Sequence, residues 1–144
     1  NLRRKFDTMF LDIEKAKYPI KQFITRGIIG IDKNETIKNA CKKMTEFGIS
    51  SLAVLENENI IGFLTKKDVI KGIAEGLSID AKINKIMSKN LVFCESSVSI
   101  GEALEIMANF QVRHILVKEK EEFIGIFSLK DIIDLQKFNL ETQI

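Results

Sequence analysis

A ten-residue segment occurs twice in this 144-residue chain, and the duplication constrains the fold more than any other feature. Residues 61–70 read IGFLTKKDVI and residues 124–133 read IGIFSLKDII, with five identical positions. The offset of 63 residues continues backwards without a gap and pairs Ala40 with Ala103, Met44 with Met107, and Phe47 with Phe110. A repeat of this length indicates two copies of one supersecondary unit.

Each copy reads as strand, helix, strand, strand, helix. In the first copy, apolar segments at 28–31, 52–55 and 60–64 predict strands, and apolar spacing predicts helices at 37–47 and from Thr65 onward. The second copy repeats this order, with strands at 91–94, 115–117 and 123–127 and helices at 99–110 and from Ser128. Because the strands are continuously apolar, we expect sheets that are buried on both faces. The expected fold class is α/β, with two pseudo-symmetric β-α-β-β-α units packed together as a tandem module.

An amphipathic helix is predicted ahead of the repeats and is expected to end before Pro19. Its apolar stripe consists of Leu2, Phe6, Met9, Ile13 and Ala16. Three roles are open for this arm: packing on the repeats, pairing with a second subunit, or connecting to an upstream domain. Since the sequence does not start with Met, we expect either a trimmed sequence or a piece of a longer chain. The predicted domains are a helix or linker at 1–18, a first unit at 19–76 and a second unit at 77–144.

The composition excludes several classes of protein. A formal net charge of +2 gives no electrostatic basis for nucleic-acid binding. No apolar run reaches the roughly 18 residues of a membrane span, and one histidine without a Cys-x-x-Cys motif leaves no zinc ligand set. Cys41 and Cys94 are expected to be small apolar core residues rather than a disulfide, so we expect a cytoplasmic protein.

The first candidate site is the strand-to-helix junction inside the repeated segment. Thr65 and Asp68 in the first copy, like Ser128 and Asp131 in the second, place a hydroxyl before a helix and a carboxylate one turn later. Free N–H groups at such a helix start suit a phosphate, and a carboxylate can accept hydrogen bonds from both hydroxyls of a ribose. The same spacing is that of a capping box that needs no ligand. The two roles are compatible, and both remain open at this point.

The repeated segments resemble the CBS domain, a tandem regulatory module named after cystathionine beta-synthase. The resemblance rests on residues 62–68 and 125–131, on FGISSLAV at 47–54 with FQVRHILV at 110–117, and on Ile-Met-Ser at 86–88. It runs from Pro19 to roughly Phe138. It implies two clefts between the paired units, in which an adenine nucleotide (AMP, ADP or ATP) or S-adenosylmethionine binds.

The resemblance also implies roles for individual residues. Asp68 and Asp131 would hold ribose, with Thr65 and Ser128 near phosphate. The apolar walls for adenine would be Ile28, Ile49, Leu91 and Val112, for which ordinary core packing is an open alternative.

The two sites are expected to be unequal. Arg113 and His114 occupy the positions that Ser50 and Ser51 hold in the first copy. An arginine presents a fixed fork of donors to phosphate, whereas serine hydroxyls donate neutrally and more weakly. We therefore expect phosphate charge to be drawn towards Arg113, with Lys130 as a secondary candidate.

The predicted function is ligand sensing without catalysis, in which binding changes the arrangement of the two units and an attached or partner domain reads the change. The alternative is a dimerisation or interaction module with vestigial nucleotide sites. Catalysis is not expected, because Asp68 and Asp131 belong to separate equivalent sites and no nucleophile constellation accompanies them. The expected partners are an adenosyl ligand, a second copy in a homodimer and further domains of a larger protein, with neither nucleic acid nor a membrane span.

Overall fold

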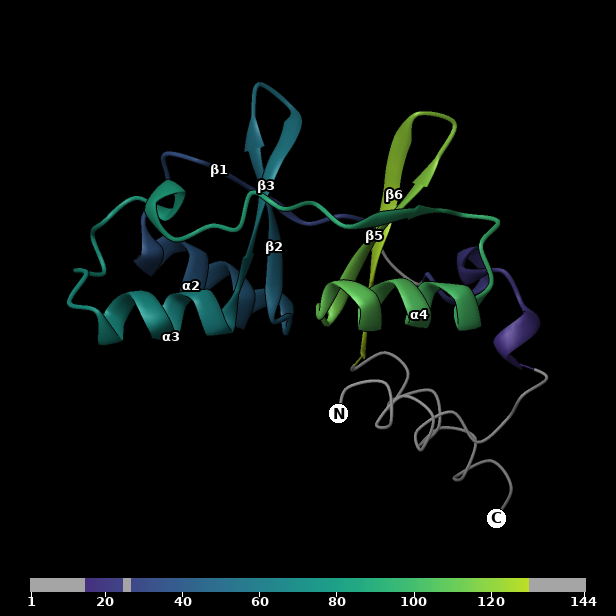
Figure 1. Cartoon of the computed structure of the whole chain (residues 1–144). Helices are drawn as coiled ribbons and strands as arrows, with labels where there is room; N and C mark the ends of the chain where they lie inside the picture. The colour runs from purple at the N-terminus through teal and green to yellow at the C-terminus, as the bar shows by residue number, and fades with distance from the viewer. Residues whose placement is uncertain (1–14, 25–26, 130–144) are drawn as a thin grey trace, which may run out of the picture. The chain divides into compact units, whose positions relative to one another are not determined.

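The computed structural model describes residues 15–24 and 27–129. Within them the chain forms two three-stranded sheets with helices packed against them (Figure 1). Residues 28–91 form one compact unit, here called the first-repeat unit. The second-repeat unit comprises residues 1–27 and 92–144. The predicted α/β class is confirmed, whereas most of the predicted N-terminal helix and of the final helix lies outside the described residues.

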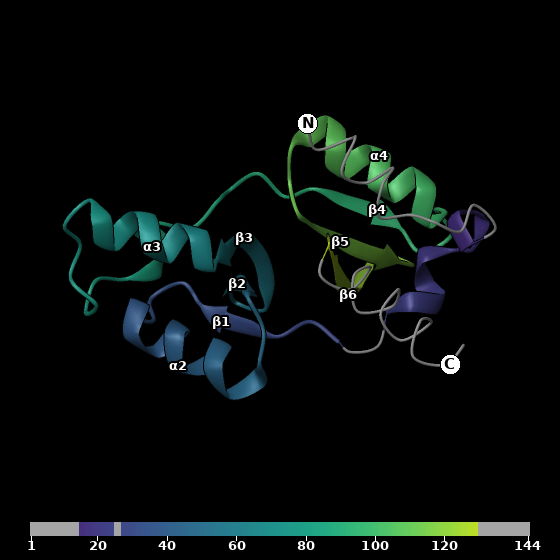
Figure 2. The ribbon, with the colours of Figure 1, turned by 90° about the horizontal axis from the view of Figure 1, so that it is seen from below.

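The first-repeat unit follows the predicted order. Its elements are β1 (Gly30–Asp32), α2 (Ile37–Phe47), β2 (Ser51–Glu56), β3 (Asn59–Thr65), α3 (Lys66–Ala74) and the 3₁₀ turn η3 (Ile83–Lys85). Strand β1 pairs with β2 in parallel, and β2 pairs with β3 as an antiparallel hairpin. Both helices contribute to one core cluster with the strands, so they cover the same face of the sheet (Figure 2).

The second-repeat unit has the same topology. Its elements are η1 (Lys15–Lys17), η2 (Ile20–Phe23), β4 (Phe93–Glu95), α4 (Ile100–Phe110), β5 (His114–Glu119) and β6 (Glu122–Ser128). The hairpins of both units have an irregularity at repeat-related positions, after Val54 and after Val117. The duplication therefore extends to local backbone detail.

The core of each unit contains an isoleucine from the chain segment that comes just before the other repeat. Ile20 is fully buried in the second-repeat core, and its N–H donates to the Val98 carbonyl at 2.8 Å. At the repeat-related position, Ile83 is fully buried in the first-repeat core, and its N–H donates to the Glu35 carbonyl at 2.9 Å. The compact units divide the chain after Gly27 and after Leu91, while the sequence boundaries at residues 19 and 77 stay predictions.

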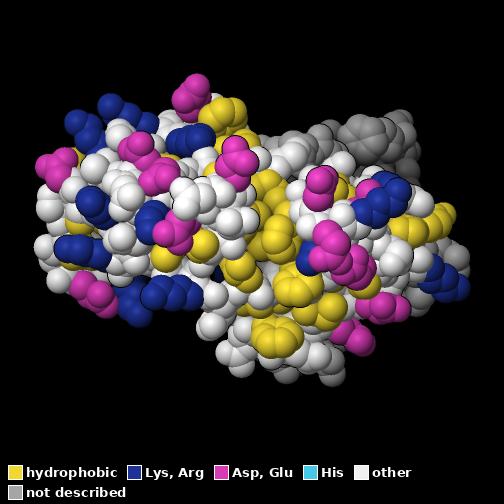
Figure 3. Space-filling view, turned by 90° about the horizontal axis from the view of Figure 1, so that it is seen from above, with side chains coloured by type: hydrophobic (Ala, Val, Ile, Leu, Met, Phe, Trp, Pro, Cys, Tyr) yellow, Lys and Arg dark blue, Asp and Glu magenta, His cyan; other side chains and the backbone are white. Residues whose placement is uncertain are grey.

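The two repeats differ in charge. Residues 28–91 contain ten lysines and eight acidic residues, whereas residues 92–129 contain three Lys or Arg and six Glu. On the face seen in Figure 3, acidic side chains lie on both parts, while the part built from the first repeat displays most of the Lys and Arg side chains. The repeats thus have the same backbone topology but differ in the charge of their side chains.

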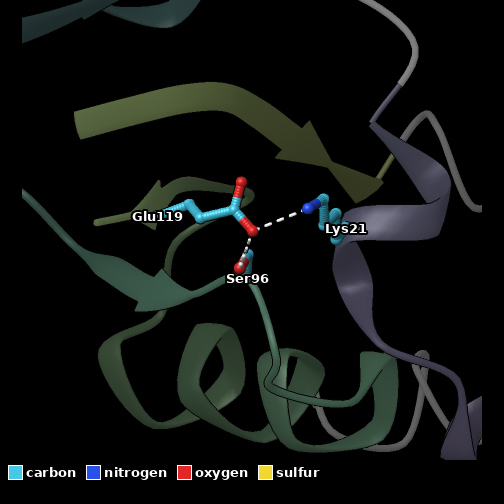
Figure 4. Close-up of polar contacts among 3 residues, drawn as sticks. All are labelled: Lys21, Ser96 and Glu119. Carbon is cyan, nitrogen blue, oxygen red and sulfur yellow. Dashed lines mark hydrogen bonds and ion pairs between the residues drawn. The ribbon is translucent and has the colours of Figure 1, made fainter. Parts of the chain in front are cut away.

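A polar cluster attaches η2, which lies before the first repeat, to the second-repeat sheet (Figure 4). The Glu119 carboxylate accepts hydrogen bonds from Lys21 Nζ at 2.7 Å and from Ser96 Oγ at 3.2 Å. The Lys21 bond lowers the pKa of Glu119 below its ordinary value, a shift that burial partly opposes. Because a lowered carboxyl pKa favours the folded state above its titration range, this attachment weakens as the pH falls through that pKa.

The burial of Ile20 in the second-repeat core and of Ile83 in the first-repeat core predicts which unit each side chain stabilises. We expect Ile20→Ala to accelerate hydrogen exchange of the β5 amides and Ile83→Ala to accelerate that of the β2 amides, each leaving the other sheet less affected. Each substitution should cost about 2–5 kcal/mol of unfolding free energy, because a buried side chain is replaced by a cavity. Hydrogen exchange of the two variants, each serving as the control for the other, measures this. Acceleration of the β2 amides by Ile20→Ala that equals or exceeds that of the β5 amides would contradict the arrangement.

The two cysteines should differ in reactivity. Both are free thiols, but Cys41 is exposed on α2, so the expectation of a core residue was wrong there. It lies at the rim of the apolar stripe, where the repeat-related Leu104 is buried. Burial, with a contribution from Glu95, raises the pKa of Cys94 to about 11.

Since thiolate is the reactive form, an alkylating reagent at about pH 8 should label Cys41 rapidly and Cys94 slowly. Mass spectrometry of the wild type and of Cys41→Ser measures both rates. Rapid labelling of Cys94 in the folded protein would show that the second-repeat core is open.

Candidate functional site

The predicted site residues of the first repeat meet at one edge of its sheet. Thr65 ends β3 and lies opposite Ser51, the first residue of β2. The Lys66 N–H donates to the Ser50 carbonyl at 3.1 Å, and the Ala53 N–H donates to the Ile29 carbonyl at 3.1 Å. The chain before β1, the start of β2 and the start of α3 are therefore adjacent, as the site hypothesis requires.

Thr65 and Asp68 form the capping box that the sequence predicts. Thr65 Oγ1 accepts from the Asp68 N–H at 3.2 Å, and Asp68 Oδ2 accepts from the Thr65 N–H at 2.9 Å. The Thr65 hydroxyl also donates to Oδ2 at 3.1 Å. All the bonds to the carboxylate fall on Oδ2, so Oδ1 takes no part in the box. Asp68 is half-buried and can meet a ligand hydroxyl through Oδ1 while the cap persists.

Gly62 permits the close approach of another segment of the chain. A Cβ at this position would lie 2.7 Å from Met87 Sδ and 2.9 Å from the Ser88 carbonyl oxygen. Ser88 exchanges two backbone hydrogen bonds with the neighbouring Phe63, each 2.8 Å long. The close approach that glycine permits is thus made by the protein's own segment at Met87 and Ser88.

The second-repeat edge has the same backbone arrangement. His114 lies opposite Ser128 in the hairpin, and the Leu129 N–H donates to the Arg113 carbonyl at 3.0 Å. The Leu116 N–H donates to the Val92 carbonyl at 2.9 Å. Ser128 and His114 are half-buried, and Arg113 is exposed. Asp131 and Lys130 lie outside the described residues.

The predicted adenine walls serve partly as core. Ile49 packs against the first-repeat cluster and Val112 against the second-repeat cluster, and both stay half-buried. Ile28 and Leu91 are half-buried at the two ends of the first-repeat unit. Core packing accounts for part of the surface of Ile49 and Val112, and contact with adenine remains a prediction for all four residues.

One asymmetry was missed by the sequence reasoning. Phe93 and Phe123 meet edge to face, with ring centroids 6.0 Å apart, and Lys118 Nζ lies 5.6 Å from the Phe93 centroid and 5.7 Å from that of Phe123. The repeat-related residues in the first unit are Gly30, Leu55 and Ile60. In the sequence, this cluster is visible only as three positions at which the second copy differs in residue type from the first.

In residues 15–24 and 27–129, no group of three or more His, Cys, Asp or Glu side chains could hold a metal ion. In the same residues, no helix has the length and apolar character needed to cross a membrane.

Comparison with known proteins identifies the repeat. The model of the CBS domain matches residues 20–75 and 83–137. An uncharacterised conserved protein from Pyrococcus horikoshii has a TM-score of 0.79 at 34% identity, with 85% of this chain and 94% of that chain covered.

Two further solved structures share the fold at lower identity and contain ligands. A CBS domain protein from Pyrobaculum aerophilum complexed with AMP has a TM-score of 0.74 at 16% identity, covering 85% of this chain and 96% of that one. A CBS domain pair in complex with 5-methylthioadenosine and S-adenosyl-L-methionine has a TM-score of 0.74 at 20% identity, covering 82% and 98%.

The capping box predicts a measurable stability effect without any ligand. Thr65→Ala removes the acceptor for the Asp68 N–H and should lower the unfolding free energy by about 0.5–2 kcal/mol, whereas Thr65→Ser keeps the hydroxyl and most of the stability. Urea denaturation of both variants tests this. Equal stability of Thr65→Ala and the wild type would mean that the box contributes nothing to the fold.

Proposed function

Because the chain belongs to the CBS domain family, we propose that it is a regulatory module that binds an adenosyl ligand in the clefts between its two units. The observation that carries the proposal is the recurrence of one sheet edge, where a hydroxyl residue at the strand-to-helix junction lies opposite residue 51 or residue 114. Relatives of the same fold solved with AMP and with S-adenosyl-L-methionine support this ligand class.

Asp68 and Asp131 are the proposed ribose ligands. An ionised carboxylate offers two acceptor oxygens, which match the two hydroxyls of a ribose. In the first repeat, Asp68 Oδ1 lies outside the capping box and is the first acceptor available to a hydroxyl. The second hydroxyl would have to share Oδ2 with Thr65, so we propose that ligand binding weakens the cap and is opposed by it.

Phosphate is assigned to the edge that carries Arg113 and His114. A guanidinium binds phosphate with charge-assisted hydrogen bonds, whereas Ser50 and Ser51 offer neutral donors. Arg113 is exposed and its side chain is therefore accessible to a ligand. We propose two unequal sites, with the more anionic end of a nucleotide at Arg113.

The proposed output is conformational and not catalytic. A ligand shifts an equilibrium between two arrangements of the units only if its affinity for the two differs. The attached or partner domain that reads this shift would belong to a larger protein, and we propose a cytoplasmic location.

A second candidate is an interaction module with vestigial ligand sites. The observation that favours it is the engagement of Asp68 in the capping box, together with exposed apolar side chains on α3, where Ile70 is 69% and Ile73 is 42% exposed. The two candidates differ in whether ligand binds at all.

Isothermal titration with AMP, ADP, ATP and S-adenosylmethionine tests the proposal. The wild type should bind at least one of the four. Arg113→Ser, which gives the second copy the residue of the first, should weaken the nucleotides by about tenfold or more, because a charge-assisted bond of about 1.5–3 kcal/mol is lost. It should weaken S-adenosylmethionine less, because this ligand has a carboxylate but no phosphate.

Lys120→Ser, at the tip of the β5–β6 hairpin, removes an equal charge away from the site edge and serves as the control. Absence of binding for all four ligands at millimolar concentration would overturn the sensing function. Equal weakening of AMP and S-adenosylmethionine by Arg113→Ser would overturn only the phosphate role.

A further inference from the structure

Residues 15–24, here called the strap, lie along the chain that leads into α4. The Ile20 N–H donates to the Val98 carbonyl at 2.8 Å. The Tyr18 carbonyl accepts a hydrogen bond from the Ile100 N–H at 3.0 Å. The strap therefore belongs to the second-repeat unit, although it comes before the first repeat in the sequence.

One carboxylate joins the strap to the second-repeat sheet. Glu119, the last residue of β5, accepts hydrogen bonds from Lys21 Nζ of the strap and from Ser96 Oγ, which directly follows β4 (Figure 4). The Lys21 side chain is 57% exposed and that of Glu119 is 31% exposed, so dissolved salt reaches the ion pair and screens it. Strands β5 and β6 are paired by their own ladder. The ion pair can therefore open without loss of the sheet.

The first repeat neutralises the corresponding carboxylate in a different way. Glu56 occupies the repeat position of Glu119 and forms an ion pair with Lys33, which directly follows β1. Both partners lie in residues 28–91, so this ion pair closes within one repeat. At the repeat position of Lys33, the second copy has the neutral Ser96.

The strap position differs between the copies in the opposite sense. Lys21 is the strap cation in the second-repeat unit, whereas its repeat-related residue is the neutral Asn84. The positive charge that neutralises the carboxylate at the end of the central strand thus comes from the repeat itself in one unit and from the strap in the other. Only the second arrangement uses that charge to hold a segment from outside the repeat.

We propose that the strap is a detachable part of the second-repeat unit, held closed by the Lys21–Glu119 ion pair, and that salt or protonation of Glu119 raises the population of an open strap while the sheet stays folded. Local openings of this kind are a general property of folded proteins. The chain passes between the two units after Gly27 and after Leu91. Opening of the strap releases the chain directly ahead of the first of these connections, and so loosens it. The device does not depend on the proposed ligand sites.

The groups around Glu119 set the direction of the pH dependence. The hydrogen bond from Lys21 lowers the pKa of Glu119, burial opposes this shift, and Ser96 and Lys120 lower the pKa further. Glu122 lies opposite Glu119 on β6 whether the strap is closed or open. Opening removes the contribution of Lys21 and raises the pKa of Glu119. The closed strap is therefore favoured above the titration range of Glu119, and the open strap gains population as the pH falls through it.

Hydrogen exchange of the whole chain, expressed as protection factors at low and high salt, tests the proposal. The amides of Ile20 and Ile100 report on the strap, because both bond across it. Lys21→Asn gives the strap the residue of the first repeat and should lower their protection by about two- to fivefold, with the β6 amides unchanged. High salt or falling pH should lower the same protection factors in the wild type, and should have little effect on them in Glu119→Gln.

The double variant Lys21→Asn with Ser96→Lys is the matched control, because it gives the second repeat the arrangement of the first. Glu119 regains an ion pair, so its pKa should again be lowered in an NMR titration of its carboxyl group, but the strap is not held. Protection of Ile20 should therefore stay as low as in Lys21→Asn.

Recovery of that protection in the double variant would show that Lys21 only neutralises Glu119, and would overturn the proposal. The same holds if Lys21→Asn leaves the strap amides at wild-type protection, or lowers the β6 amides equally.

Discussion

The burial of Ile20 and Ile83 in each other's repeat is the interaction on which the rest of the structure depends. The segment before the first repeat contributes the fully buried Ile20 and backbone hydrogen bonds to the second-repeat core. The segment before the second repeat contributes Ile83 to the first-repeat core in the same way. The second-repeat core combines two separate stretches of chain, around Ile20 and from residue 92 onward, whereas the first-repeat core lies wholly within residues 28–91. The first-repeat sheet places residues 50, 51 and 65 at one of its edges. The second-repeat sheet places residues 113, 114 and 128 at the repeat-related edge.

The two repeat-related sheet edges have the same backbone arrangement but different side chains. In the first repeat the helix start is capped by Thr65 and Asp68, and the neighbouring donors are neutral serines. In the second repeat the equivalent donors are Arg113 and His114. In the proposed site, capping and ligand binding would draw on the same carboxylate, so occupancy of that site would be linked to the stability of α3. Helices α2 and α4 differ in the same way, because α2 contains three lysines and one glutamate whereas α4 contains two glutamates and no basic residue.

Sequence reasoning predicted what depends on local pattern. The repeat offset and apolar spacing predicted the order of elements, the bounds of α2 and the capping box at Thr65. Cys41 was misplaced because it lies at the rim of a helical stripe, where periodicity does not decide burial. Ile20 was recognisably apolar, but periodicity does not say which of two similar cores buries a residue. The contacts of Lys118 with Phe93 and Phe123 depend on pairing between strands, which the linear pattern does not contain.

An NMR titration of the labelled chain with AMP tests the central claim, that the two repeat-related edges are unequal adenosyl sites, most directly. The account predicts that amide shifts concentrate at residues 49–51 and 65–68 and at residues 112–114 and 128, with the two groups saturating at different AMP concentrations and Arg113 belonging to the tighter group. Shifts confined to the hairpin tips or to the exposed faces of α2 and α4, with both edges unperturbed, would contradict it.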